Sequence, residues 1–152
     1  MPNPFKRTLL VSAMLAVTLA ACSKPLSHDE LLQRAQGALA AGKLNEAVID
    51  AKTALQQDTR SAEGRRLLGE VFLRQRKVDE AAIEFEKSLE SSKDVEVAVL
   101  YAEALLESGQ AQKLVTLYGD PDFVFAADEP EWLAGVARAQ ALSGDTFTAD
   151  DT

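Results

Sequence analysis

The chain of 152 residues carries 16 Lys and Arg against 24 Asp and Glu, so its formal net charge is -8, and it contains a single cysteine. Proteins that bind nucleic acid or anionic headgroups through charge need a basic surface, and this composition argues against both kinds of partner. One cysteine cannot form a disulfide within the chain, so its thiol needs another explanation.

Residues 1–21 have the pattern of an export signal. Lys6 and Arg7 precede an uncharged run from Thr8 to Ala21 that is rich in Leu, Val and Ala. The run is too short for a membrane-spanning helix, which needs about 20 apolar residues. Its basic start and small final residues are typical of a signal peptide. Its removal takes away two bases and no acid, which leaves a more acidic chain.

The cysteine follows this run directly, in the order Leu19-Ala20-Ala21-Cys22. That order resembles the lipobox of bacterial lipoproteins, which implies cleavage before Cys22 and acylation of its thiol and new amino group. Several acyl chains on one residue give stable membrane attachment, since each buried methylene contributes about 0.8 kcal/mol. The alternative is an ordinary cleavage site that happens to have a cysteine nearby.

The residues after Cys22 bear on where the protein is held. Ser23 stands where similar lipoproteins carry Asp when they are retained at the inner membrane, which implies the outer membrane of a two-membrane bacterium, facing the periplasm. Residues 22–27 then form a lipidated tether. At about 3.3 Å per extended residue it reaches under roughly 20 Å, so we expect the domain to lie against its membrane.

Residues 28–145 contain an internal repeat. Helix-forming runs separated by Gly and Asn, without strand-like alternation, predict an all-α domain. Sliding the sequence against itself by 34 residues aligns Ala35 with Gly69 and Ala47 with Ala81. We therefore expect helix pairs at 28–61, 62–94 and 95–120, a partial unit at 130–145, and a polar tail at 146–152.

This period resembles that of the tetratricopeptide repeat (TPR), which implies a helical-hairpin solenoid of about three repeats plus a terminal helix. Residues 65–72 read R-x-x-L-G-x-x-F and residues 81–85 read A-x-x-x-F, which is the best copy of the pattern. This copy has Arg76 in the turn between its helices. The expected repeat-packing residues are Ala35, Ala47, Leu68, Gly69, Phe72, Ala81, Phe85, Tyr101 and Ala102.

Local signals set the expected helix boundaries. Ser27 and Glu30 form a capping-box pattern at the first helix. The residues expected to cap later helices are Asn45, Ser61, Asp79 and Asp94. After a break at 119–122 and a non-periodic stretch at 123–129, Pro130 opens a last helix. Its Trp132, Leu133 and Val136 need a partner, so this helix either caps the array or belongs to a longer one.

The sequence offers little for catalysis. His28 is expected to be a solvated first-turn residue without metal-ligating neighbours. No glycine-rich phosphate loop, H-E-x-x-H pattern or Ser with a His partner in a plausible triad is found. We therefore expect a protein that is not an enzyme and that holds no cofactor or metal.

The resemblance to TPR proteins implies a concave groove lined by the first helix of each repeat. Its charged lining is expected at Glu63, Arg66, Glu70, Arg74, Glu96, Glu103 and Glu107, and its apolar lining at Leu73, Val99 and Leu106. The equivalents in the first copy are Asp29, Leu32, Gln36, Leu39 and Ala40. This mostly acidic strip with apolar patches suits a protein or peptide partner, extended or helical, with basic and apolar residues, because complementary charge aids approach and register. Alternatively, these charges only keep the array soluble.

From Ala21 to about Leu89, a lipobox followed at once by the repeat resembles the N-terminus of the TPR lipoproteins of the PEP-CTERM and exosortase system. The resemblance implies a membrane-anchored scaffold or adaptor linked to exopolysaccharide production and export, whose partner is a membrane-bound secretion or polysaccharide export component. Two alternatives stay open. One is an outer-membrane lipoprotein that assists pilus, secretin or barrel assembly, and the other is a non-functional fragment of a longer TPR array.

Overall fold

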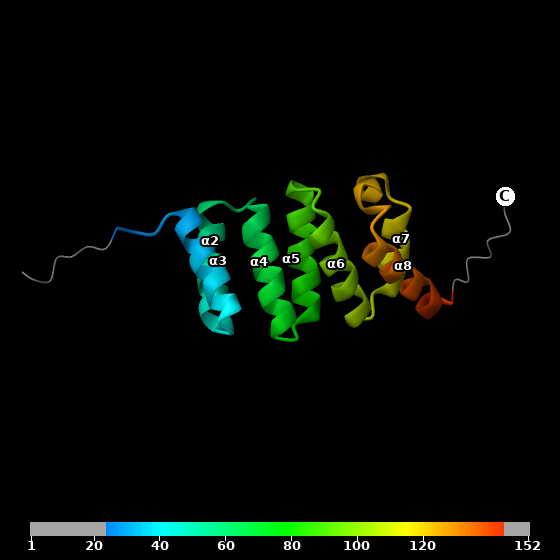
Figure 1. The fold of residues 1–152 in the computed structure, drawn as a ribbon, viewed down its shortest axis with the longest axis horizontal. Coiled ribbons are helices and arrows are strands. Elements are labelled where there is room, and N and C mark those ends of the chain that lie inside the picture. Colours follow the sequence, from blue (N-terminus) through cyan, green and yellow to red (C-terminus); the bar gives the residue numbers. More distant parts are fainter. Residues whose placement is uncertain (1–23, 145–152) are drawn as a thin grey trace, which may run out of the picture.

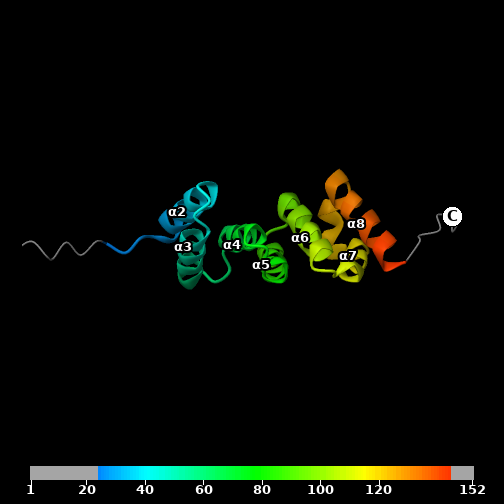
Figure 2. The same ribbon diagram turned by 90° about the horizontal axis from the view of Figure 1, so that it is seen from below.

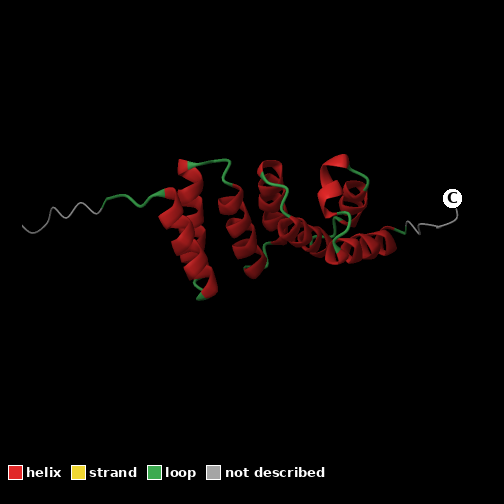
Figure 3. Ribbon diagram, turned by 45° about the horizontal axis from the view of Figure 1, so that its top comes forward, coloured by secondary structure: helices red, strands yellow, loops and turns green. Residues whose placement is uncertain are grey.

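The computed structural model describes residues 24–144, and this part of the chain is all-helical, with no strand (Figure 3). The helices are α2 (His28–Ala40), α3 (Leu44–Gln57), α4 (Ala62–Arg74), α5 (Val78–Ser91), α6 (Val95–Glu107), α7 (Ala111–Tyr118), the 3-10 helix η1 (Pro121–Ala126) and α8 (Pro130–Ser143). Cys22 and the expected polar tail at 146–152 lie outside the described residues.

The helix pairs follow one another in a row along the long axis of the molecule, from α2 and α3 through α4 and α5 to α6, and α7 and α8 lie together at the far end (Figures 1 and 2). Within the row α2 packs on α3 and α4 on α5, while α3 contacts α4 and α5 contacts α6. The first helices of the three expected pairs, α2, α4 and α6, all have 13 residues. One continuous core therefore runs along the row, and each pair of helices is covered by the next.

The turns within the pairs repeat one geometry. In each turn a residue in the left-handed conformation follows the first helix: Gly42, Arg76 and Gly109, with φ of 72°, 61° and 74°. The next backbone N–H donates to a carbonyl five residues earlier: Lys43 to Ala38, Lys77 to Phe72 and Gln110 to Leu105, with N···O distances of 2.8, 2.9 and 2.8 Å. This is the Schellman arrangement that ends helices. The turn recurs after 34 and then 33 residues, so the period of the sequence has a close counterpart in the backbone.

The expected helix caps are right in part. Ser27 and Glu30 form the capping box, and Ser61 and Asp94 accept from backbone N–H groups of α4 and α6. The caps expected at Asn45 and Asp79 are wrong, since α3 and α5 begin one residue before each of them. The preceding Schellman turn leads straight into the next helix, so no extended residue with a short polar side chain fits between the two.

The nine residues expected to pack the repeats are all buried. Gly69 on α4 meets the ring of Phe85 on α5, where an added Cβ would lie only 2.6 Å from the ring atom Cε1. The Phe85 side chain is fully buried, so its ring can shift only within the packed core. The contact between α4 and α5 at this position thus favours a residue without a side chain.

The last three elements depart from the regular pairs. The α7 helix has 8 residues, whereas α3 and α5 have 14 each, and η1 follows it with Asp120 capping its start. The α8 helix packs against both α6 and α7. Its Trp132 is buried and stacks on Phe123 of η1 with ring centroids 5.4 Å apart, and Val136 is buried as well, whereas Leu133 is exposed. Two of the three apolar residues of α8 are therefore buried against neighbouring elements.

Candidate functional site

A groove of about 500 Å³ lies between α4 and α6. It is lined by Arg66, Glu70, Leu73 and Arg74 of α4, by Arg76 of the following turn, and by Glu96, Leu100, Glu103 and Glu107 of α6. Six of the seven charged residues that the sequence predicts for a groove therefore border one depression. The seventh, Glu63, lies beside it and forms an ion pair with Arg66.

Helical periodicity brings these residues together. Glu96, Leu100, Glu103 and Glu107 follow one another at intervals of three or four residues, so they form one stripe along α6. The opposite side of α6 is buried in the core, as Val97 and Tyr101 show. The α4 helix is likewise charged on the side that faces the groove and buried in the core on the opposite side. Both helices thus turn a charged face with one leucine each, Leu73 and Leu100, toward the groove.

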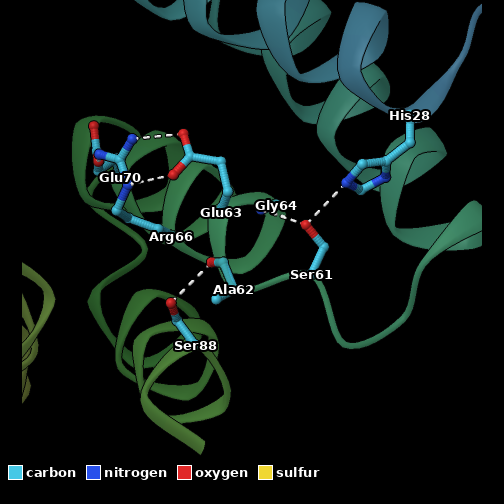
Figure 4. Close-up of polar contacts among 8 residues, drawn as sticks. All are labelled: His28, Ser61, Ala62, Glu63, Gly64, Arg66, Glu70 and Ser88. Atoms are coloured by element: carbon cyan, nitrogen blue, oxygen red, sulfur yellow. Dashed lines mark hydrogen bonds and ion pairs between the residues drawn. The ribbon is translucent and has the colours of Figure 1, made fainter. Parts of the chain in front are cut away.

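Arg66 is held by two glutamates (Figure 4). Its Nε and Nη2 donate to the two carboxylate oxygens of Glu63 at 2.9 and 2.7 Å, and its Nη1 donates to Glu70. Hydrogen bonding to Glu63 raises the pKa of Arg66 above its usual value. Desolvation raises the pKa of Glu70, although the nearby Arg66 charge acts in the opposite direction. Burial thus makes Glu70 easier to protonate than an exposed glutamate, and the charge of Arg66 is already neutralised.

The sequence prediction missed two residues of the groove, Arg76 and Leu100. Arg76 adopts the left-handed backbone conformation that Gly42 and Gly109 adopt in the equivalent turns, and its Nη1 lies 3.1 Å from a carboxylate oxygen of Glu107. An arginine in a turn position that favours glycine was the signal available in the sequence. For Leu100 the signal was its position between Glu96 and Glu103 on one helix stripe.

Three charged side chains of the groove have no ion pair within the described part of the chain: Glu96, Glu103 and Arg74. Glu96 and Glu103 are both exposed and belong to the α6 wall, whereas Arg74 belongs to the α4 wall. The charges still free to bind a ligand are therefore two carboxylates on one side and one guanidinium on the other.

A second, smaller depression of about 260 Å³ continues the groove from α6 to α8. It is lined by Val99, Ala102, Glu103 and Leu106 of α6 and by Glu131, Ala134, Gly135 and Arg138 of α8. Glu103 borders both depressions, so the two adjoin along α6 and together extend over α4, α6 and α8. Of the residues expected from the first copy, Leu39 is buried in the core, and none of the five borders either depression.

The expectation of a solvated His28 is wrong. This half-buried residue bridges three helices, because its Nδ1 lies 3.1 Å from the carbonyl oxygen of Ala54 on α3 and its Nε2 lies 3.1 Å from Oγ of Ser61 at the start of α4. Figure 4 shows the contact between His28 and Ser61. A carbonyl oxygen only accepts, so Nδ1 carries the proton. The Ser61 hydroxyl also caps α4 by accepting from the backbone N–H of Gly64. Contacts with residues 26 and 33 positions away explain why sequence reasoning overlooked this bridge.

Among residues 24–144, no group of three or more His, Cys, Asp and Glu side chains is placed to hold a metal ion. In the same residues no helix has the length and apolar character needed to cross a bilayer. No protein-family model and no curated protein sequence matches this chain.

Proposed function

We propose that this protein is a lipid-anchored TPR adaptor of the cell envelope, which binds a protein partner through the groove between α4 and α6. The observation that carries this proposal is the groove itself, with an apolar floor at Leu73 and Leu100 between charged walls. Apolar contact supplies affinity in such surfaces, while the charges select the partner.

The TPR assignment rests on the 34-residue period in the sequence and on the Schellman turns that recur with it. The close approach of Gly69 to Phe85 supports it as well, because both residues belong to the pattern. In an array of this kind each pair of helices covers its neighbour, which leaves one long surface free for a partner.

The anchor and its location are proposed from the sequence. Acylation of Cys22 holds the protein on the outer membrane, and the tether to Ser27 keeps α2 near the surface. A partner then also lies at or near that membrane. A link to PEP-CTERM and exopolysaccharide export rests on the sequence resemblance alone, and neighbouring exosortase and polysaccharide genes would support it.

We propose a binding role and no enzymatic one. The one serine and histidine pair in the described residues, His28 with Ser61, is fully engaged in holding α2, α3 and α4 together. Ser61 is buried and its hydroxyl caps a helix, so it is not positioned as a nucleophile toward a substrate.

The proposal is tested by affinity purification of the full-length protein from membranes of its own cells. The test variant is Leu73→Ala/Leu100→Ala, and its control is Val48→Ala/Val115→Ala, which shortens two half-buried residues outside the groove. We expect one protein to be enriched with the wild type and the control but lost with the groove variant. If no enriched protein depends on Leu73 and Leu100, the proposed function is wrong.

A further inference from the structure

The free charges of the groove narrow the kind of partner that it accepts. Arg66 is neutralised by Glu63 and Glu70, and Arg76 pairs with Glu107. What remains on the α6 wall is Glu96 and Glu103, two exposed carboxylates without an ion pair in the described part of the chain. A ligand that covers this wall must supply cations to them, since covering an unpaired charge is costly.

The spacing of these carboxylates selects a shape. Glu96 and Glu103 are seven residues apart on α6, which corresponds to about 10 Å along the helix axis at 1.5 Å per residue. A helix lying alongside α6 repeats its own face with the same spacing every seven residues. In an extended strand, side chains of one face recur at about 7 and 13 Å, so neither spacing matches.

The floor of the groove supplies the rest of the pattern. Leu100 lies between the two carboxylates on the same stripe of α6, and Leu73 faces it from α4. A partner helix therefore needs apolar residues between its two cations, at the third and fourth positions after the first. Arg74 stands on the opposite wall and offers a guanidinium to an acidic residue on the other flank of that helix.

We propose that the groove binds an amphipathic helix of the partner protein, with Lys or Arg at two positions seven residues apart that pair with Glu96 and Glu103, and with apolar residues between them over Leu73 and Leu100. This inference rests on the proposed function and specifies the partner of that same site. The inference also differs from the expectation of a mostly acidic strip, because three glutamates along the groove already form ion pairs with arginines.

The test uses the full-length protein in detergent and a phage-displayed library of helical peptides with one randomised face. We expect the selected peptides to carry two cations seven positions apart with apolar residues between them. Their affinity, measured by fluorescence anisotropy, should fall about tenfold for Glu96→Lys/Glu103→Lys. It should be unchanged for Glu80→Lys/Glu90→Lys, which makes the same charge change at exposed positions of α5.

A charge swap provides the sharpest check. A selected peptide with both cations replaced by glutamate should bind Glu96→Lys/Glu103→Lys better than it binds the wild type. Peptides without the cation pair, or an affinity that Glu96→Lys/Glu103→Lys leaves unchanged, would overturn the inference. If peptides without the cation pair still bind less tightly to Leu73→Ala/Leu100→Ala, the groove binds a partner and the proposed adaptor function stands, although the inference about the cation pair is wrong. A library in which no helical peptide depends on the groove also overturns the inference, while the proposed function is then decided by the affinity purification.

Discussion

Replacing Gly69 by alanine should destabilise the protein through one contact. The new Cβ would lie 2.6, 2.8 and 2.9 Å from three ring atoms of Phe85, far below the distance of ordinary van der Waals contact. Overpacking of a buried site costs about 1 to 3 kcal/mol, because the fully buried ring can shift only by displacing the core around it. The higher helix propensity of alanine relative to glycine offsets about 1 kcal/mol of this cost. We expect a net loss of up to about 2 kcal/mol in the free energy of unfolding.

The measurement is chemical and thermal unfolding followed by circular dichroism, where each kcal/mol shifts the melting temperature by about 4 °C in a domain of this size. The matched control is Gly37→Ala, because Gly37 is also a helical glycine and has no heavy atom within 4 Å of an added Cβ. That variant should be more stable than the wild type by up to about 1 kcal/mol.

The effect of the contact between residue 69 and the Phe85 ring can be isolated in a protein that lacks this ring. In a Phe85→Leu protein the ring is gone, so Gly69→Ala should there be neutral or stabilising, although Phe85→Leu alone costs stability through the cavity that it leaves. If Gly69→Ala destabilises both backgrounds equally, or stabilises the wild type as Gly37→Ala does, the account of this helix crossing is refuted.

Three further variants test other features. Arg76→Gly should raise the free energy of unfolding, measured in urea titrations, by about 0.5 to 1 kcal/mol. Relief of the left-handed conformation contributes about 1 to 2 kcal/mol, which outweighs the loss of the exposed ion pair with Glu107. A loss of stability would contradict this. The pKa of Glu70 is raised above its ordinary value of 4.5, so its contribution to stability is complete below that pH and is lost as the pH rises through the folded pKa. The stability of the wild type relative to Glu70→Gln should therefore increase as the pH falls toward 4.5, and a decrease would show that the pairing with Arg66 dominates. Cys22→Ala should move the protein from the membrane to the soluble periplasmic fraction with an unchanged helical spectrum, and continued membrane attachment would disprove the lipid anchor.

The regular part of the fold could be predicted because its determinants are local and periodic. Small residues such as Ala47 and Ala81 recur where helices cross, and Ser61 and Asp94 carry the short oxygen-bearing side chains that cap helices. Prediction failed where one turn serves two helices. The backbone N–H of Lys43 already bonds back to Ala38, so α3 begins without a separate cap.

The groove was predictable to a similar extent, and for the same reason. Residues three or four positions apart share a helix face, so the charged residues of α4 and α6 could be assigned to one surface before the structure was known. The ion pairs and hydrogen bonds that these and neighbouring residues form could not be predicted. The contact of Arg76 with Glu107 spans 31 positions, and the bridge from His28 to Ser61 spans 33. Such contacts depend on how neighbouring helix pairs are placed, which no local pattern encodes.

The central claim is that a partner protein occupies the groove between α4 and α6, and crosslinking in living cells tests it most directly. A photoreactive amino acid is placed at Leu100 in the groove and, as a control, at the exposed Ile83 on α5 outside it. The account predicts one discrete adduct from position 100, absent from position 83 and reduced in Glu96→Lys/Glu103→Lys. No adduct from position 100, or the same adducts from both positions, would contradict it.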